Sequence, residues 1–288
     1  MRPLSPPSRS SAKRSQRRKS RNRPRNPEPR KSPMNSLIKP GRILYAIAIA
    51  CFGMHYLAFV TTLSAAPPGP PWYPGAHWLS WVSGAALLAA GAILAVNVKG
   101  RWAALLLGIA LLLRVVGIHV PRVLVNLHDP GPWTSAAEML SICGGALVLA
   151  GALIRGLDGS PFPGRSSNPT TVVGQYLFAL PLFIFGAQHL MYSQFVAALI
   201  PSWIPAHVFW AYFIGAAFIA SALAIITGRL AASSSSLLGL MFLLWVLILH
   251  FPRVAASPHN ANEWTSAFVA LAMSGSAVAV AGSIANRD

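Results

Sequence analysis

Long apolar runs constrain this chain more than any other feature of its sequence. A helix needs about 20 apolar residues to cross the ~30 Å hydrocarbon core of a bilayer, and eight such runs follow one another. They cover residues 42–63, 76–97, 102–120, 134–154, 172–194, 206–227, 236–251 and 264–284. Pro, Gly and Asn gather between them, as expected where helices end. The sequence therefore predicts an all-α polytopic membrane protein with eight transmembrane helices.

Charge is scarce outside the first 42 residues. Charged residues make up 10% of the chain and hydrophobic residues 54%, whereas a soluble domain carries roughly 25% charged residues. This composition excludes a soluble enzyme. Of the 23 Lys and Arg, 14 lie in residues 1–42. The net charge of +17 therefore belongs mostly to one end of the chain and does not indicate binding to nucleic acid.

Residues 1–40 are rich in Arg, Ser and Pro and have almost no apolar side chains. Such a segment cannot bury enough surface to fold, so we expect a disordered basic tail. Three interpretations remain open. The segment is a cytoplasmic arm that touches anionic lipid, a transit peptide, which is also rich in Arg and Ser, or an untranslated stretch upstream of a start at Met34.

The two halves of the chain repeat a sequence pattern. Residues 119–136, HVPRVLVNLHDPGPWTSA, align with residues 250–267, HFPRVAASPHNANEWTSA, at an offset of 131. The pattern predicts a tandem duplication of a four-helix unit. Because four is even, both copies enter the membrane from the same side and are parallel repeats. The predicted parts are a first unit at 41–155, a cytoplasmic linker at 156–171 and a second unit at 172–285.

The positions of Lys and Arg near the helix ends predict the orientation. With the N-terminus inside, the inner side holds the basic tail together with Lys99, Arg101, Arg155, Arg165, Arg229 and Arg287. The outer side then holds Arg122 and Arg253. We therefore expect a multi-pass protein of the plasma (inner) membrane with both termini in the cytoplasm.

All eight histidines fall toward the outer side in this topology, four in each half. The candidate ligand-binding residues are His55, His119, Arg122 and His128 in the first half, and His189, His207, His250, Arg253, His259 and Trp264 in the second. Imidazoles relay protons or ligate metals, and His with Arg can donate hydrogen bonds to the carbonyls of a quinone headgroup. The alternative is an interface belt, in which His and Trp are amphipathic, Arg snorkels and Pro121 and Pro252 only end their helices. No carboxylate is shared by both halves, so no metal site is predicted.

Other motifs predict structure rather than chemistry. The chain has no Walker loop, HExxH or GxSxG, so no catalytic residue is assigned. Rows of Gly, Ala and Ser at 84–91, 144–151 and 274–282 predict close helix packing. Cys51 and Cys143 are expected to be small buried side chains. Asn262 or the hydroxyls of the WTSA motifs are expected to cap the last helix of each half.

Arg114 and Glu138 lie inside the third and fourth predicted spans at similar depths. Their counterparts at the offset of 131 are Trp245 and Val269, both apolar. A lone charge at such a depth costs about 2.5–3.5 kcal/mol on insertion scales. The pattern predicts an Arg114–Glu138 salt bridge. The alternative is that Arg114 snorkels and Glu138 faces water.

The second half resembles a known family. The stretch from FGAQHLMYSQF to AIITGR, then LLGLMFLLWVLILHFPR and NEWTSAFVALAMSGSAVAVAG, is similar to the DoxX-like membrane proteins, which are small four-helix proteins. The first half matches the same pattern more loosely. Founding members of that family are linked to sulfur-compound:quinone oxidoreduction, although most members have no assigned reaction.

Two functions are expected from the pattern and the resemblance together. One is a quinone- or redox-associated membrane subunit with an outer His/Arg pocket, for which quinone is the implied cofactor and a redox subunit the implied partner. The other is a non-enzymatic membrane scaffold or a carrier of a small solute. In both cases the lipid bilayer is the main surrounding of the chain.

Overall fold

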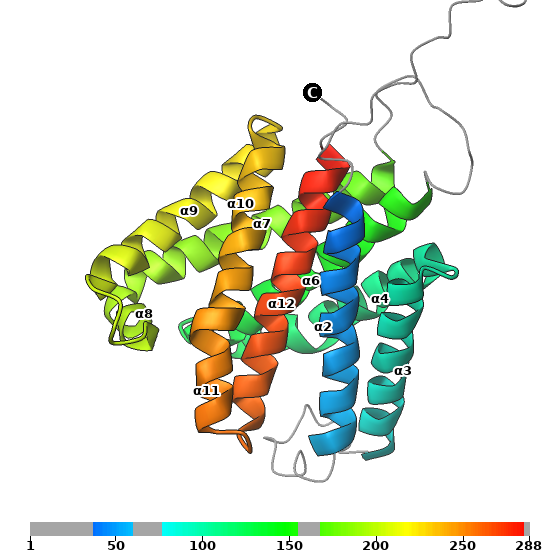
Figure 1. Cartoon of the computed structure of the whole chain (residues 1–288), viewed down its shortest axis with the longest axis horizontal. Helices are drawn as coiled ribbons and strands as arrows, with labels where there is room; N and C mark the ends of the chain where they lie inside the picture. The colour runs from blue at the N-terminus through cyan, green and yellow to red at the C-terminus, as the bar shows by residue number, and fades with distance from the viewer. Residues whose placement is uncertain (1–36, 60–76, 155–167, 285–288) are drawn as a thin grey trace, which may run out of the picture. The chain divides into compact units, whose positions relative to one another are not determined.

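The structure, a computed structural model, describes residues 37–59, 77–154 and 168–284. All regular elements in these ranges are helices, and they fall within one compact unit (Figure 1). The predicted basic tail up to residue 36 and most of the predicted linker 156–171 lie outside the described residues.

The elements follow the same order in the two halves, except that the second half has one additional short helix among the described residues. The first half contains α2 (Ile38–Phe59), α3 (His77–Val96), α4 (Gly100–Arg114), the π-helical turn η3 (Val115–His119), α5 (Val120–Val125) and α6 (Pro130–Ile154). The second half contains α7 (Pro169–Met191), α8 (Ser193–Leu199), α9 (His207–Thr227), α10 (Ala231–Trp245), the π-helical turn η4 (Val246–His250), α11 (Phe251–Ala256) and α12 (Ala261–Ile284). The bounds of α4, η3 and α5 coincide with those of α10, η4 and α11 at an offset of 131.

Seven helical segments in the described ranges are long and apolar enough to cross a membrane. They are Ile38–Ala58, Gly100–Val125, Pro130–Leu153, Pro169–Met191, His207–Thr227, Ala231–Ala256 and Ala261–Ile284. The helix α3 adds a shorter apolar stretch, Ser80–Val96. Leu106, Leu113 and Leu237 each expose more than half of their surface, which soluble monomers rarely do over large areas. The chain is a multi-pass membrane protein, so the predicted all-α membrane class is confirmed, with seven candidate spans among the described residues.

Pro121 and Pro252 do not end their helices, contrary to the predicted boundaries at 120 and 251. A proline inside an α-helix removes one hydrogen bond, and its ring clashes with the carbonyl of the preceding turn. Here a wide π turn directly precedes each proline, closed by hydrogen bonds from Val120 N–H to Val115 O and from Phe251 N–H to Val246 O. The wider turn relieves the clash, and both helices continue beyond the proline.

The small-residue rows allow helix backbones to approach closely, as predicted. A Cβ atom built on Gly144 of α6 would lie 2.6 Å from Gly174 O of α7, and one built on Gly91 of α3 would lie 2.6 Å from Ala50 N of α2. A Cβ on Gly275 of α12 would collide with the backbone nitrogen of Tyr45. These glycines are therefore required for the observed spacing of the helices.

The first helix of each half packs on the last helix of the other half. The helix α2 lies along α12, and α7 lies along α6 (Figure 1). The helices α6 and α12 meet where Gly145 faces Ser276. The start of α2 lies beside the end of α12, since Gly41 packs on Ala279 and Gly282 packs on Ile38. The core of the described unit is thus an interface between the two halves.

Candidate functional site

Most of the predicted site residues lie at one end of the helical unit. This end, called here the histidine end, is where α2, α5, α7 and α11 end and where α6, α9 and α12 begin. Figure 1 shows the ends of α2 and α11 and the start of α12 close together. The short connections between α5 and α6 and between α11 and α12 also lie there. The side chain of His77, at the first position of α3, lies outside the described ones.

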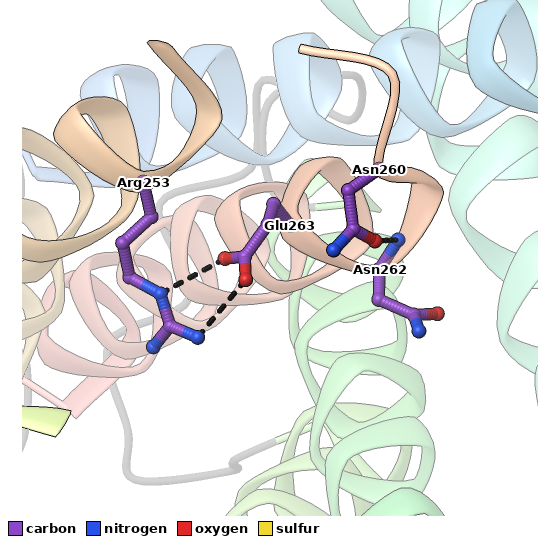
Figure 2. Close-up of polar contacts among 4 residues, drawn as sticks. All are labelled: Arg253, Asn260, Asn262 and Glu263. Carbon is purple, nitrogen blue, oxygen red and sulfur yellow. Dashed lines mark hydrogen bonds and ion pairs between the residues drawn. The ribbon is translucent and has the colours of Figure 1, made fainter. Parts of the chain in front are cut away.

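The α5–α6 and α11–α12 connections are each locked by a matching pair of side-chain contacts. Asn260 Oδ1 accepts a hydrogen bond from Asn262 N–H at 3.0 Å (Figure 2), and Trp264 Nε1 donates to Pro258 O at 2.9 Å. In the first half Gly131 N–H donates to Asp129 Oδ1 at 2.9 Å, and Trp133 Nε1 donates to Leu127 O at 3.0 Å. The tryptophan of each WTSA motif therefore fixes the loop, whereas the threonine hydroxyls donate to Pro130 O and Ala261 O and do not cap the helices.

The capping residue differs from the predicted one. Asn260 precedes the first residue of α12, and its side chain accepts from the N–H two positions on, which is the geometry of an N-cap. Asn262 was expected in that role but donates its backbone N–H instead. Trp264, a predicted ligand-binding residue, uses its indole N–H for the loop carbonyl.

Arg253 and Glu263 form an ion pair that joins α11 to the first turn of α12. Arg253 Nη2 donates to Glu263 Oε1 at 3.0 Å, and Arg253 Nε lies 3.0 Å from Glu263 Oε2 (Figure 2). The first half has Arg122 and Pro132 at these positions, so the pair belongs to the second half. Arg253 therefore has a structural partner, which reduces the number of donors that it can offer to a ligand.

The threonines of the WTSA motifs contact the first helix of the opposite half. His55 Nε2 of α2 lies 3.3 Å from Thr265 Oγ1 of α12. Thr134 Oγ1 of α6 lies 2.9 Å from Gln188 Oε1 of α7, whose Nε2 donates to Pro130 O at 3.0 Å. Gln188 thus occupies in the second half the position that His55 has in the first, although the histidine suggested by the sequence alignment was His189.

His189 belongs instead to an aromatic cluster inside the second half. Its ring stacks on Trp245 at a centroid distance of 6.3 Å and an interplanar angle of 12°, and it meets the edge of Phe218 at 5.2 Å. Its Nδ1 lies 2.8 Å from Phe185 O, so this nitrogen carries the proton and donates. The opposite nitrogen, Nε2, is then the acceptor of the neutral ring.

His250 ends the π turn η4, five residues after Trp245. Its Nδ1 is buried and has no hydrogen-bond partner in the described structure. Buried nitrogen atoms of imidazoles are normally satisfied, so this atom marks an unsatisfied polar position about one helical turn beyond Trp245. His250 also interacts electrostatically with Arg253 and Glu263.

The Arg114–Glu138 ion pair is not formed. Arg114 Nη2 donates to Tyr56 Oη of α2 at 3.0 Å, and the ion pair found among the described residues is Arg253–Glu263. Glu138 lies seven residues, two helical turns, before Gly145 and therefore on the face of α6 that meets α12. Arg114 therefore contacts α2, whereas Glu138 lies on the face of α6 that meets α12.

The remaining predicted residues lie apart from these contacts. His207 lines a shallow, open hollow of about 550 Å³ together with Ile204, Pro205 and Phe209 at the start of α9. Arg122, His128 and His259 are exposed. His119 is 7% exposed and ends the π turn η3. Within the described ranges no group of three or more His, Cys, Asp or Glu is placed to hold a metal ion.

In comparisons with known proteins, no family model, no curated protein and no solved structure matched this chain.

Proposed function

We propose that the chain is a fusion of two DoxX-like four-helix units that binds a quinone-type ligand at the histidine end of its second half. A tandem repeat is supported by the common element bounds at the offset of 131 and by the matching contacts of Trp133 with Trp264 and of Asp129 with Asn260. In this proposal α3 is an eighth crossing, because it packs along α2 through Gly53.

The proposed orientation is supported by the positions of the basic residues. We place both termini in the cytoplasm of a cell with an inner membrane, so that the histidine end faces outward. The exposed aromatic residues Trp203, Trp210 and Trp133 at this end suit the level of the lipid headgroups. A quinone headgroup resides at a similar level of the bilayer.

The observation that carries the ligand assignment is the stacked pair His189–Trp245. A planar quinone ring is bound by flat aromatic neighbours together with a few hydrogen-bonding groups at its carbonyl oxygens. The aromatic cluster of Phe218, Trp245 and His189 supplies the flat aromatic neighbours. The unpartnered His250 Nδ1 supplies a hydrogen-bond donor to a quinone carbonyl when it carries the proton. The chain would act as the membrane subunit of a redox system, with the chemistry carried by the quinone and a partner subunit.

Quinone extraction from the full-length protein, purified in mild detergent, tests this proposal. We expect a quinone absorbance in the extract and a rise in the melting temperature when decylubiquinone is added. His189→Leu and His250→Ala should each raise the apparent Kd for decylubiquinone about tenfold, corresponding to ~1.4 kcal/mol of binding free energy. His259→Ala, in an exposed position of the nearby loop, is the matched control and should respond like the wild type.

The opposite outcome is equally clear. No extracted quinone and no change in melting temperature with decylubiquinone would reject the ligand assignment. The scaffold or solute-carrier function would then be the better account of the chain.

A further inference from the structure

Arg114 is a cation inside a membrane span, and none of the described carboxylates forms an ion pair with it. It lies in the apolar segment Gly100–Val125. Its Nη2 donates to Tyr56 Oη at 3.0 Å, and its guanidinium carbon lies 6.0 Å from the centre of the Tyr56 ring. Its Nε is buried without a hydrogen-bond partner. Since arginine stays charged at any physiological pH, this group has hydrogen-bonding capacity and charge to offer.

His119 adds a second nitrogen without a hydrogen-bond partner in the described structure, one helical turn further along. It ends the π turn that starts directly after Arg114, so the wide turn places the two side chains about one turn apart. His119 is 7% exposed, and its Nε2 is buried without a partner. Its electrostatic neighbours are Arg114 and Arg122, both positive.

No carboxylate compensates this positive group in the described part of the chain. Glu263 pairs with Arg253, and Asp129 accepts the backbone N–H of Gly131. Glu138 forms no ion pair with Arg114. An unpaired charge in the bilayer is costly and normally marks a functional position.

The second half carries no such cation. At the offset of 131 Trp245 replaces Arg114, and its stacking partner His189 takes the place that Tyr56 has beside Arg114. The first half thus has a cation at these two positions, whereas the second half has a stacked pair of rings. A ligand of the first half must therefore differ in charge from one of the second.

We propose that Tyr56, Arg114 and His119 form a binding site for an oxyanion, a carboxylate or a phosphate group. Arg114 supplies the charge and its free N–H, His119 donates from Nε2 when that atom is protonated, and Tyr56 holds the guanidinium in place. Leu113 and Val116, which flank Arg114 in sequence, are 68% and 60% exposed on the lipid-facing side. An amphipathic acid can therefore place its apolar chain in the bilayer while its oxyanion reaches Arg114.

The test uses the full-length protein in neutral detergent and three probes: oleate, phosphatidylglycerol and inorganic phosphate. We expect an anion to raise the melting temperature of the wild type, and Arg114→Gln to raise its apparent Kd at least tenfold. His119→Ala should weaken binding by a smaller factor. Arg101→Gln, which removes an arginine from the opposite end of α4, is the matched control and should bind like the wild type.

The probes also identify the source of the oxyanion. A response to oleate or phosphatidylglycerol alone assigns the ligand to the lipid phase, and an equal response to inorganic phosphate assigns it to water. If Arg114→Gln fails to fold, Arg114→Trp introduces the residue that the second half has at this position and serves as the second variant. The proposal is overturned if no probe stabilises the wild type, or if a folded Arg114 variant responds to the probes as the wild type does.

This inference does not rest on the quinone assignment. Arg114→Gln should leave the response to decylubiquinone unchanged, and His189→Leu should leave the response to the anions unchanged. Failure of one site is therefore distinguishable from failure of the other.

Discussion

The Gly275→Val variant is expected to lose about 3 kcal/mol of stability, the largest effect foreseen for a single substitution. A side chain at this position of α12 would collide with the backbone of Tyr45 and would lie 2.9 Å from Gly41 O of α2. Overpacking typically costs about 1–3 kcal/mol, and the upper end applies because backbone atoms cannot rotate away. The helices α2 and α12 would have to separate along the interface of the two halves.

The first half offers an independent repetition of this test. Gly144, which matches Gly275 at the offset of 131, packs on Phe178 N and Gly174 O of α7. We expect Gly144→Val to be about as damaging as Gly275→Val. Gly131→Val is the control, since a Cβ there meets no other helix among the described residues and approaches only the side chain of Asp129, with Oδ1 at 3.3 Å. Unfolding in detergent, followed by circular dichroism, measures all three, and a mild Gly275→Val would contradict the close packing.

Arg42→Met is expected to cost about 1.5–3 kcal/mol, the usual range for hydrogen bonds of a charged donor. Arg42 lies in the first turns of α2 and is 8% exposed. Its Nη1 donates to Leu94 O and to Ala95 O, the latter at 3.1 Å. These carbonyls belong to the last turn of α3, which has no further helical N–H to satisfy them. The positive charge also suits the negative end of the helix dipole.

A neighbouring lysine separates this effect from a simple loss of charge. Lys39 is exposed and lies three residues before Arg42, so Lys39→Met removes the same charge without removing the contacts. Arg42→Lys should fall between the two, because one ammonium group cannot reproduce the fork of the guanidinium. Equal melting temperatures for Arg42→Met and Lys39→Met would show that the hydrogen bonds of Arg42 to the end of α3 contribute nothing to stability.

The sequence predicts where the helices lie along the chain better than it predicts how each helix is rotated about its own axis. Hydropathy depends on composition along the chain, so the apolar runs and the small-residue rows were found at nearly their observed places. Whether two charges meet depends on the direction in which each side chain leaves its helix. For this reason the matching depths of Arg114 and Glu138 did not predict the observed contact of Arg114 with Tyr56.

The sequence indicates candidate residues near helix ends but not which of them contact one another. Sequence alignment makes His55 and His189 equivalent positions of the two halves. The contacts show that Gln188 is the equivalent of His55, because Thr265 contacts His55 and Thr134 contacts Gln188. The π turn before Pro121 was also missed, because no residue pattern distinguishes a proline that ends a helix from one that a wide turn accommodates. Both features required the three-dimensional arrangement of neighbouring helices.

Cysteine labelling in intact cells tests most directly the central claim, that both halves bring their polar ends to the same outer face of the membrane. In a variant with Cys51→Ala and Cys143→Ser, single cysteines are introduced by His128→Cys and His259→Cys at the histidine end and by Lys99→Cys and Arg229→Cys at the opposite end. We expect an impermeant maleimide to label positions 128 and 259 from outside the cell and positions 99 and 229 only after permeabilisation. Labelling of positions 128 and 259 from opposite sides of the membrane would contradict the parallel arrangement of the two halves.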